Sequence, residues 1–426
     1  NGHKITGADG KAVIELSIAA FTLTDCKGTG KITHASGGTG CGVYINGGTF
    51  NMYGGSITGN TATDGKGRGG GVYVTSGGAF KMFGGSITGN EATDGGGVYM
   101  IGSNSKFTMK GGSITGNTAD GNGGGVYVNG GTFEMSGSAG ITGNKADSTG
   151  GGVCVNYDGT FNMSNNSCIT GNTAYHGGGV YVGRTPDSNN YKPGNFAMSG
   201  GTIGGATTDD ANQAQYGGGV YVAGTFTLTG GSITGNKTNG NGGGVYVNAD
   251  STFTVSGAPK ITNNTQKTTT SSNVYLTEGP EGKPGAVIVI GDAHLASGAE
   301  IGVRTGKKPT DGTPVTIATN ANSGDKQYFS SDVSKYSMYV EGSELKLAIV
   351  PAHEHRWTYT ASNATTITAT CGDDSCTSKD GGSITINKPS TNLTYSGSEK
   401  AARLTESNWQ GGNVTITYKQ GDKVLT

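Results

Sequence analysis

Hydrophobic residues alternate with polar or small residues in short runs over residues 43–276, and Gly, Asn and Asp separate the runs. This alternation has the period of a pleated β-strand, whose successive side chains point to opposite faces. Apolar residues at the helical spacing i, i+3, i+4 do not recur, and Leu, Glu and Lys are few. The pattern therefore predicts an all-β chain.

The runs form an internal repeat. A V-Y-V run occurs nine times, at steps of 29, 26, 28, 27, 27, 40, 25 and 29 residues. A T-F-x-M run and an S-I-T-G-N run follow most copies. Three strand-like runs in about 27 residues predict one coil of a β-solenoid, because propeller blades need four strands and about 40 residues. The copies begin at Val43, Val72, Val98, Val126, Val153, Val180, Val220, Val245 and Val274.

Stacked coils place like residues directly above one another, about 4.8 Å apart. The alternation predicts inward columns of Val, Phe, Met and Ile, such as the column that contains Phe80, Phe107 and Phe133. We expect a column of Asn side chains to hydrogen-bond from coil to coil at a bend, as in stacked cross-β ladders. Its predicted members are Asn60, Asn90, Asn117, Asn144, Asn172, Asn236 and Asn264.

Composition supports a narrow core. The chain of 426 residues has 83 Gly, only 32% hydrophobic residues and a net charge of −1. The near-neutral balance argues against electrostatic binding of nucleic acid, which needs a basic patch. No run of eighteen apolar residues occurs, so we expect no membrane insertion. The expected state is a monomer.

The repeat motifs carry a resemblance. G-G-V-Y, as at residues 96–99, and I-T-G-N, as at 114–117, look like the repeats of chlamydial polymorphic outer membrane proteins. Residues 20–350 resemble the right-handed parallel β-helix regions of large surface proteins of Gram-positive gut bacteria. The resemblance implies a right-handed coil and a secreted, cell-attached, adhesin-like protein.

Changes in the pattern predict five segments. The regular β-helix repeats occupy residues 43–276, and an N-terminal cap with the incoming coil precedes them at 1–42. Irregular C-terminal coils and a cap follow at 277–350. Residues 351–387 form a small β module with His and Cys. Residues 388–426 look similar to the start of an immunoglobulin-like (Ig-like) surface module.

The module at 351–387 contains the candidate zinc ligands. His353, His355, Cys371 and Cys376 would bind Zn²⁺ tetrahedrally as a structural site. The spacing is not that of a standard zinc finger, and a Cys371–Cys376 disulfide is the alternative in an oxidising compartment. Apart from this structural zinc, we expect no cofactor.

The central residues of the V-Y-V runs form the candidate ligand-binding column. Alternation places these rings outward, where they would contact a sugar through their apolar faces. The alternative is that stacked Tyr residues only stabilise the sheet. The column consists of Tyr44, Tyr73, Tyr99, Tyr127, Tyr181, Tyr221, Tyr246 and Tyr275, with Cys154 interrupting it.

Three functions fit this sequence. The first is a non-enzymatic extracellular cell-surface protein, adhesin-like or a stalk, that binds glycans or host surface molecules. The second is a carbohydrate-active β-helix enzyme of the polysaccharide lyase or glycoside hydrolase type. Hydrolysis needs paired carboxylates on one face, whereas acids here lie mostly at variable turns, and His34, His176 and His294 are isolated in the sequence. The third is a pure structural spacer.

The 40-residue step holds the one interruption of the repeat. Its acidic residues Asp187, Asp209 and Asp210 are oxygen ligands of the kind that Ca²⁺ prefers. A tolerated surface insertion is the alternative interpretation of this segment.

Overall fold

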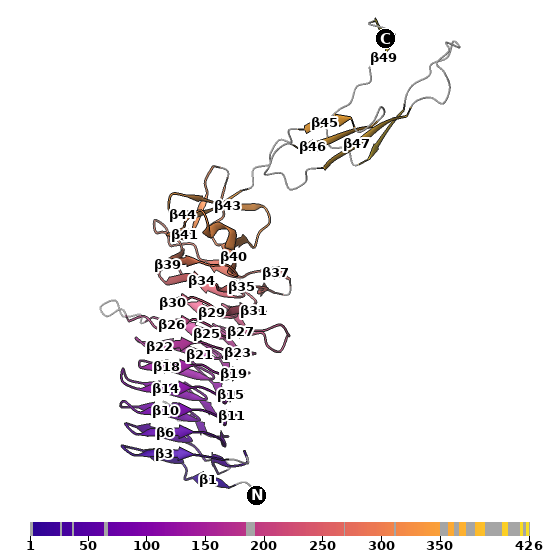
Figure 1. Cartoon of the computed structure of the whole chain (residues 1–426). Coiled ribbons are helices and arrows are strands. Elements are labelled where there is room, and N and C mark those ends of the chain that lie inside the picture. The colour runs from indigo at the N-terminus through magenta and orange to yellow at the C-terminus, as the bar shows by residue number, and fades with distance from the viewer. Residues whose placement is uncertain are drawn as a thin grey trace. The chain divides into compact units, whose positions relative to one another are not determined.

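The computed structural model describes residues 3–349 apart from 26–27, 36–37, 64–66, 185–191, 268 and 311, together with six strands between residues 357 and 425. The chain divides into two compact units, Asn1–Ile349 and Val350–Thr426. The first unit is a parallel β-solenoid of about 11 turns, and small β modules follow it (Figure 1). The fold class predicted from the repeat is confirmed.

Among the described residues, eight coils contain a fourth short strand in addition to the predicted three. The V-Y-V, T-F-x-M and S-I-T runs each form a ladder of parallel strands, with equivalent positions of the repeat paired from coil to coil. The fourth strand, usually the two residues after the conserved bend Asn of each repeat, forms a further ladder. Two residues carry no alternation, so the sequence pattern gave no sign of this strand.

The V-Y-V ladder contains β2 (Ile14–Leu16), β5 (Val43–Asn46), β9 (Val72–Thr75), β13 (Val98–Ile101), β17 (Val126–Asn129), β21 (Val153–Asn156), β25 (Val180–Val182), β29 (Val220–Val222), β33 (Val245–Val247) and β38 (Val274–Leu276). The T-F-x-M ladder contains β3 (Ala20–Leu23), β6 (Thr49–Met52), β10 (Ala79–Met82), β14 (Lys106–Met109), β18 (Thr132–Met135), β22 (Thr160–Met163), β26 (Asn195–Met198), β30 (Thr225–Leu228), β34 (Thr252–Gly257), β39 (Ile288–Leu295) and β41 (Val315–Thr319).

The S-I-T ladder contains β1 (Lys4–Gly7), β4 (Lys31–His34), β7 (Ser56–Thr58), β11 (Ser86–Thr88), β15 (Ser113–Thr115), β19 (Gly140–Thr142), β23 (Cys168–Thr170), β27 (Thr202–Gly204), β31 (Ser232–Thr234), β35 (Lys260–Thr262), β40 (Glu300–Thr305) and β42 (Phe329–Ser331). The fourth ladder contains β8 (Thr61–Ala62), β12 (Glu91–Ala92), β16 (Thr118–Ala119), β20 (Lys145–Ala146), β24 (Thr173–His176), β28 (Gln213–Tyr216), β32 (Lys237–Thr238) and β36 (Thr265–Gln266), with β37 (Thr270–Ser271) antiparallel at its end.

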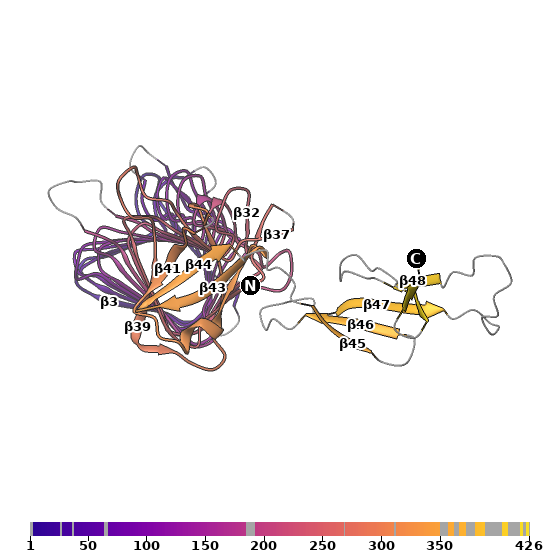
Figure 2. The ribbon, with the colours of Figure 1, turned by 90° about the horizontal axis from the view of Figure 1, so that it is seen from above.

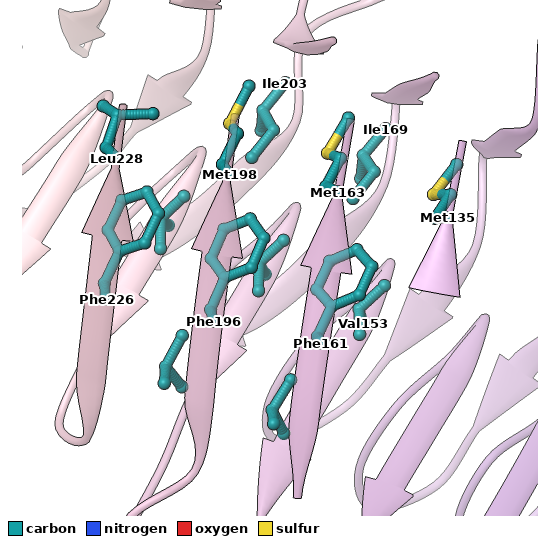
Figure 3. Packing of buried hydrophobic residues seen from close by; sticks show 14 of the residues in the cluster. Met135, Val153, Phe161, Met163, Ile169, Phe196, Met198, Ile203, Phe226 and Leu228 are labelled. Atoms are coloured by element: carbon teal, nitrogen blue, oxygen red, sulfur yellow. The ribbon is translucent and has the colours of Figure 1, made fainter. Parts of the chain in front are cut away.

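The predicted Val, Phe, Met and Ile columns fill the interior. Phe80, Phe107 and Phe133 are fully buried, and their rings stack with centroids 4.6 Å apart and planes within 6°. Figure 3 shows the same arrangement further along the axis, where Phe161, Phe196 and Phe226 project from successive strands beside the Met and Ile columns. Burial of each such ring contributes roughly 1.5–3 kcal/mol, so the columns supply most of the cohesion between coils.

The Asn column forms a continuous hydrogen-bonded ladder inside one corner. The Asn90 side-chain Nδ2 donates to Asn117 Oδ1 at 2.9 Å, and the Asn90 backbone N–H donates to the same oxygen at 3.0 Å. Asn90 Nδ2 also donates to the Ile57 carbonyl of the preceding coil. Side-chain bonds of 2.8 to 3.1 Å join the whole series, namely Asn60, Asn90, Asn117, Asn144, Asn172, Asn212, Asn236, Asn264 and Asn273.

Two residues that the repeat did not identify occupy the ends of this ladder. His34 donates its backbone N–H to Asn60 Oδ1, and its ring Nδ1 lies 3.0 Å from the same oxygen. At the other end, Asn273 donates its backbone N–H and its Nδ2 to the two Asp332 oxygens, both at 2.6 Å. Burial raises the pKa of Asp332, while the Asn273 hydrogen bonds and the Arg304 charge oppose that shift. His34 is therefore a buried structural residue rather than an isolated one.

The 40-residue step preserves the ladder. Part of the additional sequence lies between Gly204 and Asn212. Asn212 occupies the position of the Asn in the I-T-G-N motif of other coils, so it continues the ladder. Asp210 accepts a hydrogen bond from the Thr207 hydroxyl at 2.6 Å, so this acid belongs to a local turn. Asp187 lies outside the described residues.

The solenoid ends in an antiparallel cap. The 3₁₀ helix η1 (Asp325–Tyr328) leads to β42, and β43 (Tyr336–Glu341) and β44 (Glu344–Ile349) form a hairpin. β44 pairs antiparallel with β41 of the last coil (Figure 2). A reversed strand at this position covers the edge that a further parallel coil would otherwise extend. His294 Nδ1 lies 2.9 Å from the buried Asp325 carboxylate, so it too has a structural partner.

The strands that the structure describes in the second unit all pair antiparallel. β45 (Trp357–Ala361), β46 (Thr366–Cys371), β47 (Asp380–Asn387) and β48 (Arg403–Ser407) form one sheet in that order. β49 (Tyr418–Gln420) and β50 (Lys423–Leu425) form a separate pair. The first sheet takes strands from both predicted segments, because β48 lies within 388–426 and pairs with β47. The bounds of the two modules and the Ig-like assignment remain predictions.

Replacing Asn117 by Ala tests the ladder. The change removes the acceptor of two Asn90 donors, and the Ile87 carbonyl loses the Asn117 donor. Asn144 Oδ1 keeps only the backbone N–H of residue 117 from this coil. We therefore expect a loss of about 3 kcal/mol in the free energy of unfolding. Guanidinium unfolding followed by far-UV circular dichroism measures it. The control is Asn51→Ala, because that amide is exposed and bonds Thr22 at 3.4 Å; equal unfolding midpoints for both variants would contradict the prediction.

Candidate aromatic binding surface

The register of the V-Y-V ladder places the central residues of the runs in one outward row. Tyr99 pairs with Tyr127, and Cys154 occupies the same register between Tyr127 and Tyr181. Beyond Tyr275 the row ends at Arg304. The row lies on the face of the ladder opposite the buried Val columns, as the alternation predicted.

The middle of this row is not exposed, which corrects the expectation that all the rings face solvent. Tyr99 and Tyr127 are only 1% and 5% exposed, and Cys154 is fully buried. Tyr99 meets both Tyr73 and Tyr127 edge to face, with interplanar angles of 84° and 88°. The Asn129 amide donates to the Tyr99 hydroxyl at 2.8 Å. These residues form a second small core and present almost no surface to solvent.

The residues that directly precede the Gly triplets form a column beside the tyrosine row, and their side chains cover the rings in its middle. The Arg68 guanidinium lies over the Tyr99 ring at 5.1 Å from its centroid. Asp94 accepts two hydrogen bonds from Asn122 at 3.0 Å, and the Thr149 hydroxyl donates to Asn122 Oδ1 at 2.6 Å. The first Gly of each triplet permits this close approach. At Gly123, φ is +67° and an added Cβ would lie 2.7 Å from the Tyr127 Cβ.

The same column changes its chemistry toward the C-terminus, where it becomes aromatic. His176 and Tyr216 pair in register, and their rings stack at 5.8 Å. The His176 ring also meets Tyr221 edge to face at 4.8 Å and lies 4.6 Å from Tyr175. We call this region the aromatic surface; it consists of Tyr175, His176, Tyr181, Tyr216, Tyr221, Tyr246 and Tyr275. His176 looked isolated in the sequence, yet its position directly before a Gly triplet, shared with Tyr216, was the signal that groups it here.

The tyrosines of the aromatic surface stack along the axis. Tyr221 and Tyr246 have centroids 4.7 Å apart and planes within 12°, and Tyr181 and Tyr275 continue the stack on either side. These rings are half-buried, and Tyr175 is 52% exposed. Because neighbouring rings cover much of each other's faces, the stack presents mainly hydroxyl-bearing edges. The exposed faces belong to the flanking rings, above all Tyr175.

Burial keeps these side chains neutral. It raises the pKa of the Tyr181, Tyr221 and Tyr246 hydroxyls to about 12, so they are hydrogen-bond donors and acceptors at neutral pH. Burial lowers the pKa of His176. One positive group, Arg184, lies at the edge of the stack and pairs with Asp250 at 3.3 Å. The surface thus combines apolar ring area with neutral hydroxyls and a flanking ion pair.

Of the predicted zinc ligands, only Cys371 belongs to a strand that the structure describes. Cys371 is the last residue of β46, while His353, His355 and Cys376 lie outside the described residues. In the part of the chain that is described, no group of three or more His, Cys, Asp or Glu side chains could hold a metal ion. Cys41, Cys154 and Cys168 are free thiols, and burial raises the pKa of Cys154 to about 12. No helix among the described residues has the length and apolarity of a bilayer span.

Comparisons with known proteins give no relative from which a role could be transferred. A scan against protein-family models, a search of curated proteins and a search of solved structures each find no match.

The low pKa of His176 predicts a pH dependence of stability. The unfolded chain binds this proton more tightly than the folded one, so the contribution to stability is complete above pH 6.5 and is lost as pH falls through the lowered folded-state pKa. Unfolding midpoints measured from pH 7 to pH 4.5 should decline less in His176→Gln than in the original protein. Parallel curves for the two proteins would contradict the prediction.

Proposed function

We propose that this chain is a non-enzymatic extracellular protein of the cell surface, adhesin-like or a stalk, that holds glycans along its aromatic surface. The observation that carries the proposal is the aromatic surface itself, on which half-buried rings and neutral hydroxyls are fixed to a stiff scaffold. Aromatic rings beside hydroxyl and planar polar groups are the side chains that bind sugars, because the C–H faces of a pyranose pack on a ring while its hydroxyls find partners.

The scaffold suits presentation of such a surface. About 11 turns at about 4.8 Å per turn give a solenoid roughly 50 Å long. The Asn ladder and the Phe column run through almost all of these turns, so the rings of the aromatic surface keep a fixed spacing. A fixed array of similar rings favours several weak contacts with one extended glycan over a single tight pocket, which is multivalent binding. The similarity of the repeats to those of bacterial surface proteins supports the same role.

A glycan array probed with the whole chain tests this function. We expect binding that weakens about tenfold or more in the Tyr175→Ala, Tyr216→Ala double variant, since these rings flank the stack and one is exposed. The matched control is Tyr53→Ala, which removes an exposed ring that stacks on Phe83 elsewhere on the solenoid.

Three results would contradict parts of the proposal. Equal binding by the double variant and the original protein would show that glycans do not bind at the aromatic surface. If no glycan binds, the chain acts as a pure structural spacer instead. Release of reducing or unsaturated sugars from a polysaccharide panel would contradict the non-enzymatic assignment and favour a carbohydrate-active β-helix enzyme.

A further inference from the structure

One turn of the solenoid carries side chains that its backbone conformation disfavours. The turn between the V-Y-V strand and the T-F-x-M strand contains left-handed backbone positions. Neighbouring coils fill them with small residues, including Gly102 at φ +96°, Gly130 at φ +84° and Gly131 at φ +78°. In the turn between β21 and β22 the corresponding positions hold Tyr157 at φ +52° and Asp158 at φ +64°.

A bulky residue in the left-handed region is an outlier, because its Cβ crowds the backbone. Tyr157 is 48% exposed, so burial offsets only part of this strain. Nearly half of its surface remains open to solvent. Backbone strain that packing does not explain is characteristic of functional positions.

Tyr157 and Asp158 stand at the rim of a hollow. The hollow spans the turns of three successive coils, and its other lining residues include Ser103, Asn129, the Gly130–Gly131 pair and Lys192. Gly130 and Gly131 contribute no side chains, so the middle coil is recessed between its neighbours. An added Cβ at Gly131 would lie 2.5 Å from the Ser105 carbonyl oxygen, so the backbone itself keeps this position empty.

The groups around the hollow differ in chemistry and converge on one space. Tyr157 offers an exposed ring, Asp158 a carboxylate, Lys192 an ammonium and Ser103 a hydroxyl. The Asn129 amide is held by its hydrogen bond to the Tyr99 hydroxyl, at 2.8 Å. The opposite charges of Asp158 and Lys192 leave the lining without a strong net charge, which does not favour a highly charged ligand.

We propose that this hollow is a saccharide-binding site, separate from the aromatic surface, that takes one or two neutral sugar units. Tyr157 packs against the C–H face of a pyranose, Asp158 accepts hydrogen bonds from its hydroxyls, and Asn129, Ser103 and Lys192 supply the remaining polar contacts. This inference rests on the proposed function of a glycan-binding surface protein, and it adds a second, more selective glycan contact to that function.

Because Gly tolerates a left-handed backbone, the Tyr157 side chain can be removed without disturbing the turn. Tyr157→Gly restores the small residue that neighbouring coils use, so the fold should be as stable as before or more so, because strain is removed. The matched control is Ser76→Gly, which relieves the same kind of left-handed position, φ +54°, in the turn between β9 and β10. Asp158→Asn keeps the shape and removes the carboxylate.

The probes are galactose, glucose, N-acetylglucosamine, cellobiose and maltose, titrated into the whole chain by NMR or calorimetry. We expect at least one of these sugars to bind, with affinity about tenfold weaker or more in Tyr157→Gly, weaker in Asp158→Asn, and unchanged in Ser76→Gly. Unfolding midpoints of all variants are measured alongside, so that lost binding is not confused with lost structure.

The outcomes separate this site from the proposed function. Binding that is lost in Tyr157→Gly but kept in the Tyr175→Ala, Tyr216→Ala variant supports the hollow. Binding that is unchanged in a folded Tyr157→Gly variant overturns it, and if the double variant then loses binding the aromatic surface still stands. If none of the five sugars binds while the glycan array is positive, the hollow is overturned and the proposed function survives; if the array is also negative, both are overturned.

Discussion

The Asn ladder is the interaction on which the register of the whole solenoid depends. Apolar columns attract one another at any register that keeps Phe near Phe, but an amide at a closed corner is satisfied only when the next amide lies directly above it. Asn117, for example, has an Asn partner on either side and donates to the Ile87 carbonyl. A slip of one residue would leave these groups buried without partners, which costs more than the bonds themselves contribute. The ladder therefore sets the alignment, and the stacked rings then supply the cohesion.

The ladder also has a direction. In each Asn–Asn bond the side-chain amide donates toward the C-terminal coil and the oxygen accepts from the N-terminal one, so these bonds all point the same way along the axis, as hydrogen bonds do along a helix. The residues at its ends complement this polarity. His34 places N–H groups at the carbonyl end, and the Asp332 carboxylate receives the donors at the other end. The two ends are thus chemically unlike, as the ends of a series of aligned dipoles should be.

Much of the fold follows from the sequence because it is periodic, and the exceptions occur where periodicity fails. The Phe column and the bend Asn residues recur at fixed offsets, so their burial could be predicted. Asn212 was missed because an insertion separates it from its motif, and His34 and Asp332 because a different residue type ends the series. The burial of Tyr99 depends on Arg68 of another coil, a residue whose column changes identity at each step. Alternation shows which face of a strand a side chain occupies, but not which side chains from other coils cover that face.

The in-register stacking has a consequence for how such a molecule changes over generations. Each coil meets its neighbours through the same sequence motifs, so each contact is of the same type at every level. Unequal recombination between near-identical repeats would add or remove one complete coil and leave every interface as it was. The length of the solenoid can therefore change in increments of one coil, while the sequences of the cap and the small β modules stay the same.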